Sequence, residues 1–284
     1  MEIDVNGTRL WFDIDGATAV PDDASMRSRP TLLLVHGGPG SYDHSYFEPF
    51  FWTFRDVAHV VAVDLRDHGR SARHDPADWS FELCADDLAA FCTTLGIHRP
   101  VVLGHSMGGC IAMLLAIRHP DVPGSLILLS TLARFDLETL VEGFRRNGGD
   151  EVAELARRDY RGDAISASEW DRVFAAFGPT VLDRDALMRR IRNPDVNGPG
   201  MDRLRALDLT VELPSVRCPT LIVTGERDGP TPVEMAEEIA AGLRPGIGQL
   251  VTLPDAGHFP WLDRPEAVRD LVDAVLRDHS GSPG

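Results

Sequence analysis

Short apolar runs recur along the chain, and segments with helical periodicity separate several of them. The runs are almost continuously apolar rather than alternating, as in strands that are buried on both faces of a parallel sheet. They lie at Thr31–Val35, Val60–Val63, Val101–Leu103, Leu126–Leu129, Thr220–Val223 and Gln249–Leu253. Because strands and helices alternate, the pattern predicts an α/β fold with a mostly parallel central sheet flanked by helices.

Turn and cap residues mark the ends of several predicted elements. Asn6-Gly7 favours a type I′ turn and predicts a hairpin between Ile3–Val5 and Arg9–Ile14. Ser80 is a suitable N-cap for an amphipathic helix. Further helices are predicted over Met107–Arg118, from Thr231-Pro232 onward and after Pro265.

One long segment, from about Leu132 to Leu213, interrupts the alternation. It contains helical periodicity and no convincing strand, so we expect a helical insertion between two strands of the sheet. Its expected helices are Phe135–Phe144, Glu151–Arg158, Ser168–Phe177 and Asp185–Arg192. The predicted organisation is a core made of residues 1–131 and 214–284, with a helical cap over residues 132–213.

The composition is that of an ordinary globular protein, with 43% hydrophobic and 25% charged residues in a chain of 284. A formal net charge of −16 argues against nucleic acid and anionic membranes as partners. No apolar run is long enough to span a membrane, and the N-terminus does not resemble a secretory signal. The oligomeric state is not indicated.

The four cysteines are scattered without the spacing of a metal site or a disulfide framework. They are Cys84, Cys92, Cys110 and Cys218. We therefore expect free thiols in a reducing cytoplasm, no bound metal and no cofactor. The predicted partner is a small-molecule substrate.

The strongest chemical signal is Gly104-His105-Ser106-Met107-Gly108, which joins the strand Val101–Leu103 to the helix Met107–Arg118. Glycines on either side of a sharp strand-to-helix turn relieve crowding and leave the central serine projecting from the top of the sheet. The Met107 N–H then lies at a helix N-terminus, where it stabilises a developing oxyanion. Ser106 is therefore the predicted nucleophile.

A serine nucleophile needs a base and an orienting acid. In the fold that carries the serine on a strand-to-helix turn of this kind, the acid and then the base follow it along the chain. His258 follows the last apolar run and is the predicted base, whereas His279 belongs to the polar C-terminal tail. Asp228 follows the run Thr220–Val223 and is the predicted acid. It could instead cap the helix that starts near Thr231. The rival acids are Asp136, Glu226 and Asp255.

The loop His36-Gly37-Gly38-Pro39-Gly40 follows the run Thr31–Val35 and should supply a second oxyanion donor. Gly38 is the predicted donor, because small residues let backbone N–H groups approach a substrate. His36 is expected to hydrogen-bond this loop. The candidates for the edge of the substrate pocket are His36, Gly37, Trp170 and Phe259.

Together these motifs resemble the α/β-hydrolase superfamily over nearly the whole chain. The stretch Asp64-Leu65-Arg66-Asp67-His68-Gly69-Arg70-Ser71 and the pair Gly257-His258 also match that superfamily in order. The loop at residues 36–40 is similar to the HGGPG loop of proline iminopeptidases. Those enzymes usually carry GGSWG around the serine, whereas this chain carries the GHSMG common among esterases, lactonases and thioesterases.

The resemblance implies a cofactor-free serine hydrolase that acts on a small ester, lactone or amide. A second possibility is a proline iminopeptidase-type aminopeptidase, and for it Glu169 is the candidate cap carboxylate that would bind a substrate amine. The same scaffold also supports non-hydrolytic enzymes, such as lyases and perhydrolases, and small-molecule receptors.

Overall fold

The computed structural model describes residues 1–182 and 189–280. Eight strands form one sheet in the order β1-β2-β6-β5-β7-β8-β9-β10, in which the pairs β1–β2 and β2–β6 are antiparallel and the remaining pairs are parallel. Their bounds are β1 Glu2–Val5, β2 Thr8–Asp15, β5 Thr31–Val35, β6 His59–Val63, β7 Val101–His105, β8 Ser125–Leu129, β9 Thr220–Gly225 and β10 Gly248–Leu253. The predicted α/β fold with a mostly parallel sheet is confirmed.

The hairpin at the N-terminus forms as predicted, because Asn6 (φ 43°) and Gly7 (φ 73°) both adopt the left-handed conformation of a type I′ turn. A second hairpin was missed. Strands β3 (Ala19–Asp22) and β4 (Ser25–Ser28) pair in a separate two-stranded sheet that the sequence pattern did not predict. Most residues of this hairpin are exposed, so the sequence contains no hydrophobic pattern that predicts it.

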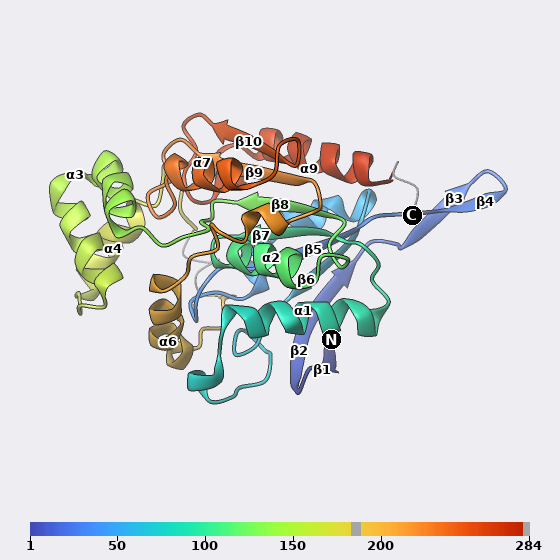
Figure 1. Cartoon of the computed structure of the whole chain (residues 1–284), viewed down its shortest axis with the longest axis horizontal. Coiled ribbons are helices and arrows are strands. Elements are labelled where there is room, and N and C mark those ends of the chain that lie inside the picture. The colour runs from blue at the N-terminus through green and yellow to red at the C-terminus, as the bar shows by residue number, and fades with distance from the viewer. Residues whose placement is uncertain (183–188, 281–284) are drawn as a thin grey trace.

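The helices cover both faces of the sheet (Figure 1). Strands β7 and β8 are buried at every position, and both are contacted by α2 and α9. Helix α1 packs on α2, and α7 packs on β9 and β10. The helices outside the insertion are α1 Phe81–Leu95, α2 Met107–Arg118, α7 Val233–Gly242, α8 Pro260–Asp263 and α9 Pro265–Ser280, with 3₁₀ helices η1 His44–Phe47, η2 Phe51–Asp56, η3 Pro76–Asp78 and η4 Leu213–Ser215.

Local capping agrees with the sequence. Ser80 accepts a hydrogen bond from the Leu83 N–H at 3.1 Å, and Gly96 ends α1 with a φ of 65°. Helix α9 extends to residue 280, so His279 lies in a helix near Ser125 and not in a polar tail. The four cysteines are buried and free, and none of the described helices is long and apolar enough to cross a membrane.

Three described α-helices, α3, α4 and α6, lie in the segment between β8 and β9, at one end of the molecule in Figure 1. Two of the expected helices, over residues 135–144 and 151–158, form one helix, α3 (Leu137–Arg161), with a break at Gly149. Helix α4 (Ala167–Ala175) matches its prediction. The predicted helix Asp185–Arg192 falls largely outside the described residues. Helix α6 (Pro194–Arg205) was missed because it contains Pro199 and two glycines.

Candidate active site

Ser106 lies in a strained turn between β7 and α2. Its φ of 54° and ψ of −124° are unusual for a residue with a side chain, and such strain costs about 1–3 kcal/mol and concentrates at functional sites. The flanking glycines permit the turn: a Cβ at Gly104 would lie 2.7 Å from the Gly109 nitrogen, and one at Gly108 would overlap the Val35 carbonyl. Helix α2 therefore begins in direct contact with β5.

Asp228 and His258 meet although 30 residues separate them. His258 Nδ1 lies 3.0 Å from Asp228 Oδ1 and 3.2 Å from Oδ2, and both side chains are buried. Thr231 completes the contacts of this carboxylate, donating its N–H to Oδ1 at 2.9 Å and its hydroxyl to Oδ2 at 2.8 Å. Because an ionised carboxylate only accepts hydrogen bonds, His258 Nδ1 is the donor and Nε2 is left as the free ring nitrogen.

The rival acids are engaged elsewhere. Asp136 is the N-cap of α3 and accepts from Glu138 N and Thr139 N. Glu226 accepts from the Asp255 N–H, and Asp255 pairs with an arginine at the surface. Helix α7 begins after Pro232 as its N-cap, so the alternative of Asp228 as a helix cap is wrong.

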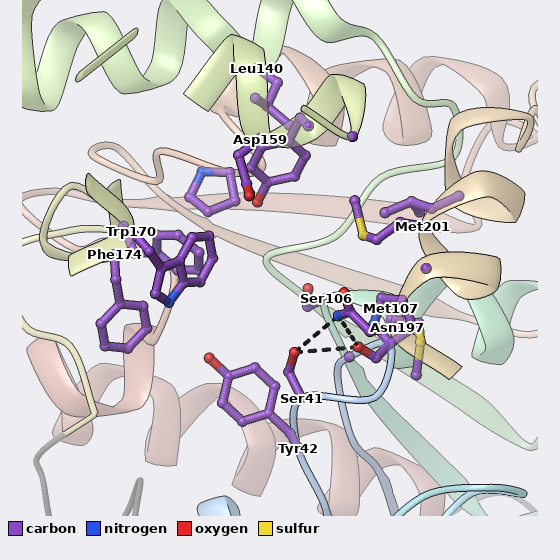
Figure 2. Close-up of a pocket in the computed structure, with 18 of the residues that line it drawn as sticks. Ser41, Tyr42, Ser106, Met107, Leu140, Asp159, Trp170, Phe174, Asn197 and Met201 are labelled. Carbon is purple, nitrogen blue, oxygen red and sulfur yellow. Dashed lines mark hydrogen bonds between the residues drawn. The ribbon is translucent and has the colours of Figure 1, made fainter. Parts of the chain in front are cut away.

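Ser106 and His258 line one cavity of about 850 Å³. Figure 2 shows Trp170 and Phe174 on one side of this pocket, with Ser106 on the other beside Met107 and Met201. The cavity is enclosed partly by residues of α3, α4 and α6, which belong to the segment between β8 and β9. The aromatic and methionine side chains give part of the cavity wall an apolar surface, and this part favours burial of an apolar substrate group.

Two backbone N–H groups beside Ser106 have no hydrogen-bond acceptor among the described residues. Gly38 and Met107 both line the cavity, and Met107 is the first residue of α2. Neither N–H takes part in a backbone or side-chain hydrogen bond, whereas the N–H groups of Gly37 and Gly40 are both bonded. A free N–H at a helix N-terminus attracts negative charge.

A buried chain of hydrogen bonds connects the loops around Ser106. The Gly37 N–H donates to the Tyr46 hydroxyl at 2.8 Å, and this hydroxyl lies 2.8 Å from His105 Nδ1. The other ring nitrogen of His105, Nε2, lies 2.8 Å from the His258 carbonyl oxygen. A carbonyl only accepts, so His105 Nε2 carries a proton. Burial lowers the pKa of His105 well below its ordinary value, so this ring is neutral and Tyr46 donates to Nδ1.

Two further buried histidines support the loop at residues 36–40. His68 Nε2 accepts from the Gly40 N–H at 2.8 Å, and its Nδ1 donates to the Arg66 carbonyl at 2.8 Å. Burial lowers the pKa of His68 to about 3. His36 Nε2 accepts from the Leu65 N–H at 3.0 Å, and burial lowers its pKa as well. Both rings are therefore neutral acceptors that hold the loop in place.

Four of the residues expected in the pocket do not line it. His36 and Gly37 lie beneath it, where their polar groups are used within the loops. Phe259 is buried against His105 behind the cavity wall. Glu169 closes a capping box with Ser166 and pairs with an arginine on α3, so its carboxylate serves α4. Of this set only Trp170 borders the cavity.

Sequence reasoning missed several polar residues that do line the pocket. Asp159, near the end of α3, lines it, and its carboxylate has no hydrogen bond within residues 1–182 and 189–280. Burial raises its pKa. Tyr42 and Arg190 line it as well, and no sequence motif distinguishes any of the three. No group of three or more His, Cys, Asp or Glu residues in the described part of the chain is arranged to hold a metal ion.

Comparison with known proteins gives a family match over most of the chain. A family model described as "alpha/beta hydrolase fold" matches residues 30–265. A pimeloyl-[acyl-carrier protein] methyl ester esterase of Neisseria meningitidis is 31% identical over 268 residues, which cover 88% of this chain and 79% of that protein. The proline iminopeptidase PfmaB of Pestalotiopsis fici is 25% identical over 292 residues and 98% of both chains.

Among solved structures, the enol-lactonase of Burkholderia xenovorans superposes with a TM-score of 0.70 at 26% identity. The match covers 98% of this chain and all of the lactonase. The lactonase therefore shares the architecture described above, and the names of the three proteins indicate different substrates.

Proposed function

Because this chain belongs to the α/β-hydrolase fold family, we propose that it is a serine hydrolase that cleaves a small ester, lactone or amide through an acyl-enzyme on Ser106. It is a hydrolase by its family relationships. One observation carries the finer proposal: His258, hydrogen-bonded to the buried Asp228, borders the same cavity as the strained Ser106.

In this mechanism His258 Nε2 takes the proton of the Ser106 hydroxyl while Oγ attacks the substrate carbonyl carbon. Asp228 keeps the proton on Nδ1 and stabilises the imidazolium that forms. The imidazolium then returns its proton to the leaving alcohol or amine, and an ester bond to Ser106 remains. Water, deprotonated by His258 in turn, attacks that ester, releases the acid and regenerates the hydroxyl.

The negative charge on the carbonyl oxygen needs donors that are in position beforehand. We assign the N–H groups of Gly38 and Met107 to this role, because they border the cavity and have no acceptor among the described residues. Such a donor typically contributes about 3–4 kcal/mol to the stability of the transition state. The hydrogen bonds of Gly37 and Gly40 fix the loop from which the Gly38 N–H projects.

We further infer that residues 132–213 act as a cap that selects the substrate. The side chains of Trp170, Phe174 and Met201 come from this segment and form apolar walls of the cavity. The proposed substrate class is therefore an ester or lactone with an apolar group, since burial of apolar surface contributes about 25 cal/mol per Å².

An aminopeptidase of the proline iminopeptidase type is the second candidate, and Asp159 is the observation that favours it. A substrate with a free α-amine needs a carboxylate in the pocket, because an unpaired buried ammonium is costly. Glu169 is occupied as a helix cap, whereas Asp159 lines the cavity without a hydrogen-bond donor among the described residues. The apolar Met107 beside the serine favours the ester or lactone.

The experiment that tests the proposal combines labelling with turnover. A fluorophosphonate should label the wild-type protein and fail to label Ser106→Ala, whose residual hydrolysis should be lower by roughly 10⁴ to 10⁶. The kcat/KM values for p-nitrophenyl butyrate, a homoserine lactone and proline p-nitroanilide should rank the ester or lactone first. If the proline substrate ranks first and Asp159→Asn weakens it selectively, the peptidase candidate replaces the ester hydrolase.

Labelling without turnover of any substrate in the panel would contradict the hydrolase mechanism. It would favour a receptor with a retained serine site, or a non-hydrolytic enzyme such as a lyase or perhydrolase. Near-normal turnover by Ser106→Ala would contradict the serine mechanism itself.

A further inference from the structure

One wall of the cavity carries a cation with an unused donor. The Arg190 guanidinium lies 5.1 Å from the centre of the Tyr42 ring, and both residues line the cavity that contains Ser106. Its Nε is buried and has no hydrogen-bond acceptor in the described part of the chain. A buried guanidinium donor without an acceptor is unusual, because the desolvation of such a group is normally offset by an anion or a carbonyl.

Neither Arg190 nor its neighbour Arg192 forms an ion pair with any described residue, although most of the ion pairs of this acidic chain involve arginine. Burial lowers the pKa of Arg190, and the charge of Arg192 lowers it further. Tyr42 and Asp43 oppose this effect, and the Asp43 carboxylate also accepts hydrogen bonds from the N–H groups of Ser45 and Ile191. Arg190 and Arg192 therefore present positive charge to the cavity without an ion-pair partner among residues 1–182 and 189–280.

The backbone next to Arg190 is fixed to the loops of the active site. The Ile191 N–H donates to Asp43 Oδ2 at 2.6 Å, and the Asn193 N–H donates to the Gly40 carbonyl at 2.9 Å. The Asn193 side chain also donates to the Asp67 carbonyl at 2.8 Å. Arg190 is thus held beside the loop that carries Gly38.

The acidic residues of the cavity do not cancel this charge. In Figure 2, Asp159 and Tyr42 lie on opposite sides of the pocket, and Arg190 packs on Tyr42. The other acidic lining residues come from α4, α6 and the residues after α3; of these, Asp202 pairs with Arg205. The cavity is therefore polarised, with its positive side at Tyr42 and Arg190.

We propose that Tyr42, Arg190 and Arg192 form a subsite that binds a carboxylate of the substrate, so that the preferred ester carries a second, ionised carboxyl group. This proposal rests on the proposed function, because it names the substrate class of the same site. A carboxylate in the cavity would accept from the N–H groups of the Arg190 guanidinium that face the cavity and from the Tyr42 hydroxyl, and a charge-assisted hydrogen bond of this kind is about twice as strong as a neutral one. The chemistry at Ser106 is unchanged.

Two methyl esters of similar length test the subsite. Monomethyl adipate is anionic and methyl hexanoate is neutral, so the ratio of their kcat/KM values isolates the contribution of the carboxylate. The wild-type ratio should favour the adipate, and Arg190→Gln should lower the ratio by roughly 10- to 100-fold. Arg190→Lys should retain part of the preference because it keeps the charge. Arg189→Gln is the matched control, since Arg189 is exposed and does not line the cavity.

A measurement without turnover separates this proposal from the proposed function. Adipate should bind to the Ser106→Ala protein in calorimetry, and binding should be lost when Arg190→Gln is added. This result would stand even if neither ester were hydrolysed, in which case only the hydrolase proposal fails. A wild-type ratio near one, equal losses for both esters, or adipate binding that survives Arg190→Gln would overturn the subsite.

Discussion

Replacing Asp228 by Asn tests which carboxylate orients His258. Asn has nearly the same shape, and its carbonyl oxygen still accepts the Thr231 N–H, now 2.9 Å from Oδ1. Its NH₂ group takes the place of Oδ2, which now accepts the Thr231 hydroxyl and lies 3.2 Å from His258 Nδ1. The amide oxygen still lies 3.0 Å from Nδ1, but the NH₂ group competes for the same ring nitrogen, so the preference for the tautomer with the proton on Nδ1 is weakened. The negative charge beside the imidazolium is lost.

The expected cost is about 10⁴ in kcat, because replacing the aspartate of a Ser-His-Asp arrangement by asparagine has roughly this effect. It corresponds to about 5 kcal/mol of transition-state stabilisation. The free energy of unfolding should change by about 1 kcal/mol or less, since the shape and the Thr231 N–H bond are kept. Hydrolysis of p-nitrophenyl butyrate measures the first quantity and urea denaturation the second.

Asp136→Asn is the matched control. Asp136 caps α3 by accepting from Glu138 N and Thr139 N, and Asn caps a helix about as well as Asp. Its kcat should therefore stay within about twofold, whereas Asp136→Ala should lose about 1 kcal/mol of stability without a specific loss of activity. The reasoning is refuted if Asp136→Asn suppresses kcat while Asp228→Asn keeps it.

Three further perturbations probe the support of the site. Tyr46→Phe should lower kcat roughly 10-fold with little change in KM, because His105 loses its hydrogen-bond donor and the Gly37 N–H loses its acceptor. Thr224→Val is the control, since it removes a buried hydroxyl that has no partner among the described residues. It should leave kcat and KM unchanged. The pKa of His68 is about 3 in the folded protein, whereas its value in the unfolded chain is near 6.5. Between these two pH values the unfolded state binds more protons than the folded state. The free energy of unfolding should therefore fall on acidification below pH ~6.5, by up to about 1.4 kcal/mol per pH unit. Urea denaturation at pH 7, 6 and 5 should show a smaller fall for His68→Gln; an equal fall would contradict this. Gly108→Ala should destabilise the fold by about 3 kcal/mol or more, because its Cβ would overlap the Val35 carbonyl, and a normal Tm would exclude the close packing of α2 on β5.

The sequence by itself determined the elements whose signals are local. Strand β5 was predicted with its observed bounds from a run of apolar residues, and α2 from an apolar segment that stops before a proline. The turn around Ser106 was recognisable because Gly104 and Gly108 are required by close approach of neighbouring backbone, which is a constraint written into a few adjacent positions. The hairpin β3–β4 and α6 lack such signals, since one is mostly polar and the other contains Pro199.

The residues of the candidate site also fall into two groups, those that the sequence predicts and those that only the packed fold brings to the site. Asp228 and His258 are predicted because each follows a strand of a parallel sheet, and the carboxyl ends of such strands meet at one edge. The run before His258 is a half-exposed edge strand, β10, and not buried on both faces as its apolar residues indicated. Their mutual distance, and the place of Gly38 and Met107 on one cavity with Ser106, follow from that topology. The order of the strands along the chain is therefore sufficient to predict that these residues lie close together.

Only the tertiary structure decided what the remaining polar side chains do. Glu169 and Asp159 are both helical carboxylates, and the sequence favoured Glu169, yet Glu169 caps its own helix while Asp159 borders the cavity. Likewise Tyr46 and His105 are 59 residues apart and share a hydrogen bond, and Arg190 differs from the exposed Arg189 only in the neighbours that bury it. The charge, tautomer and pairing of a group depend on which distant residues remove it from water, and that is a property of the packed fold and not of local sequence.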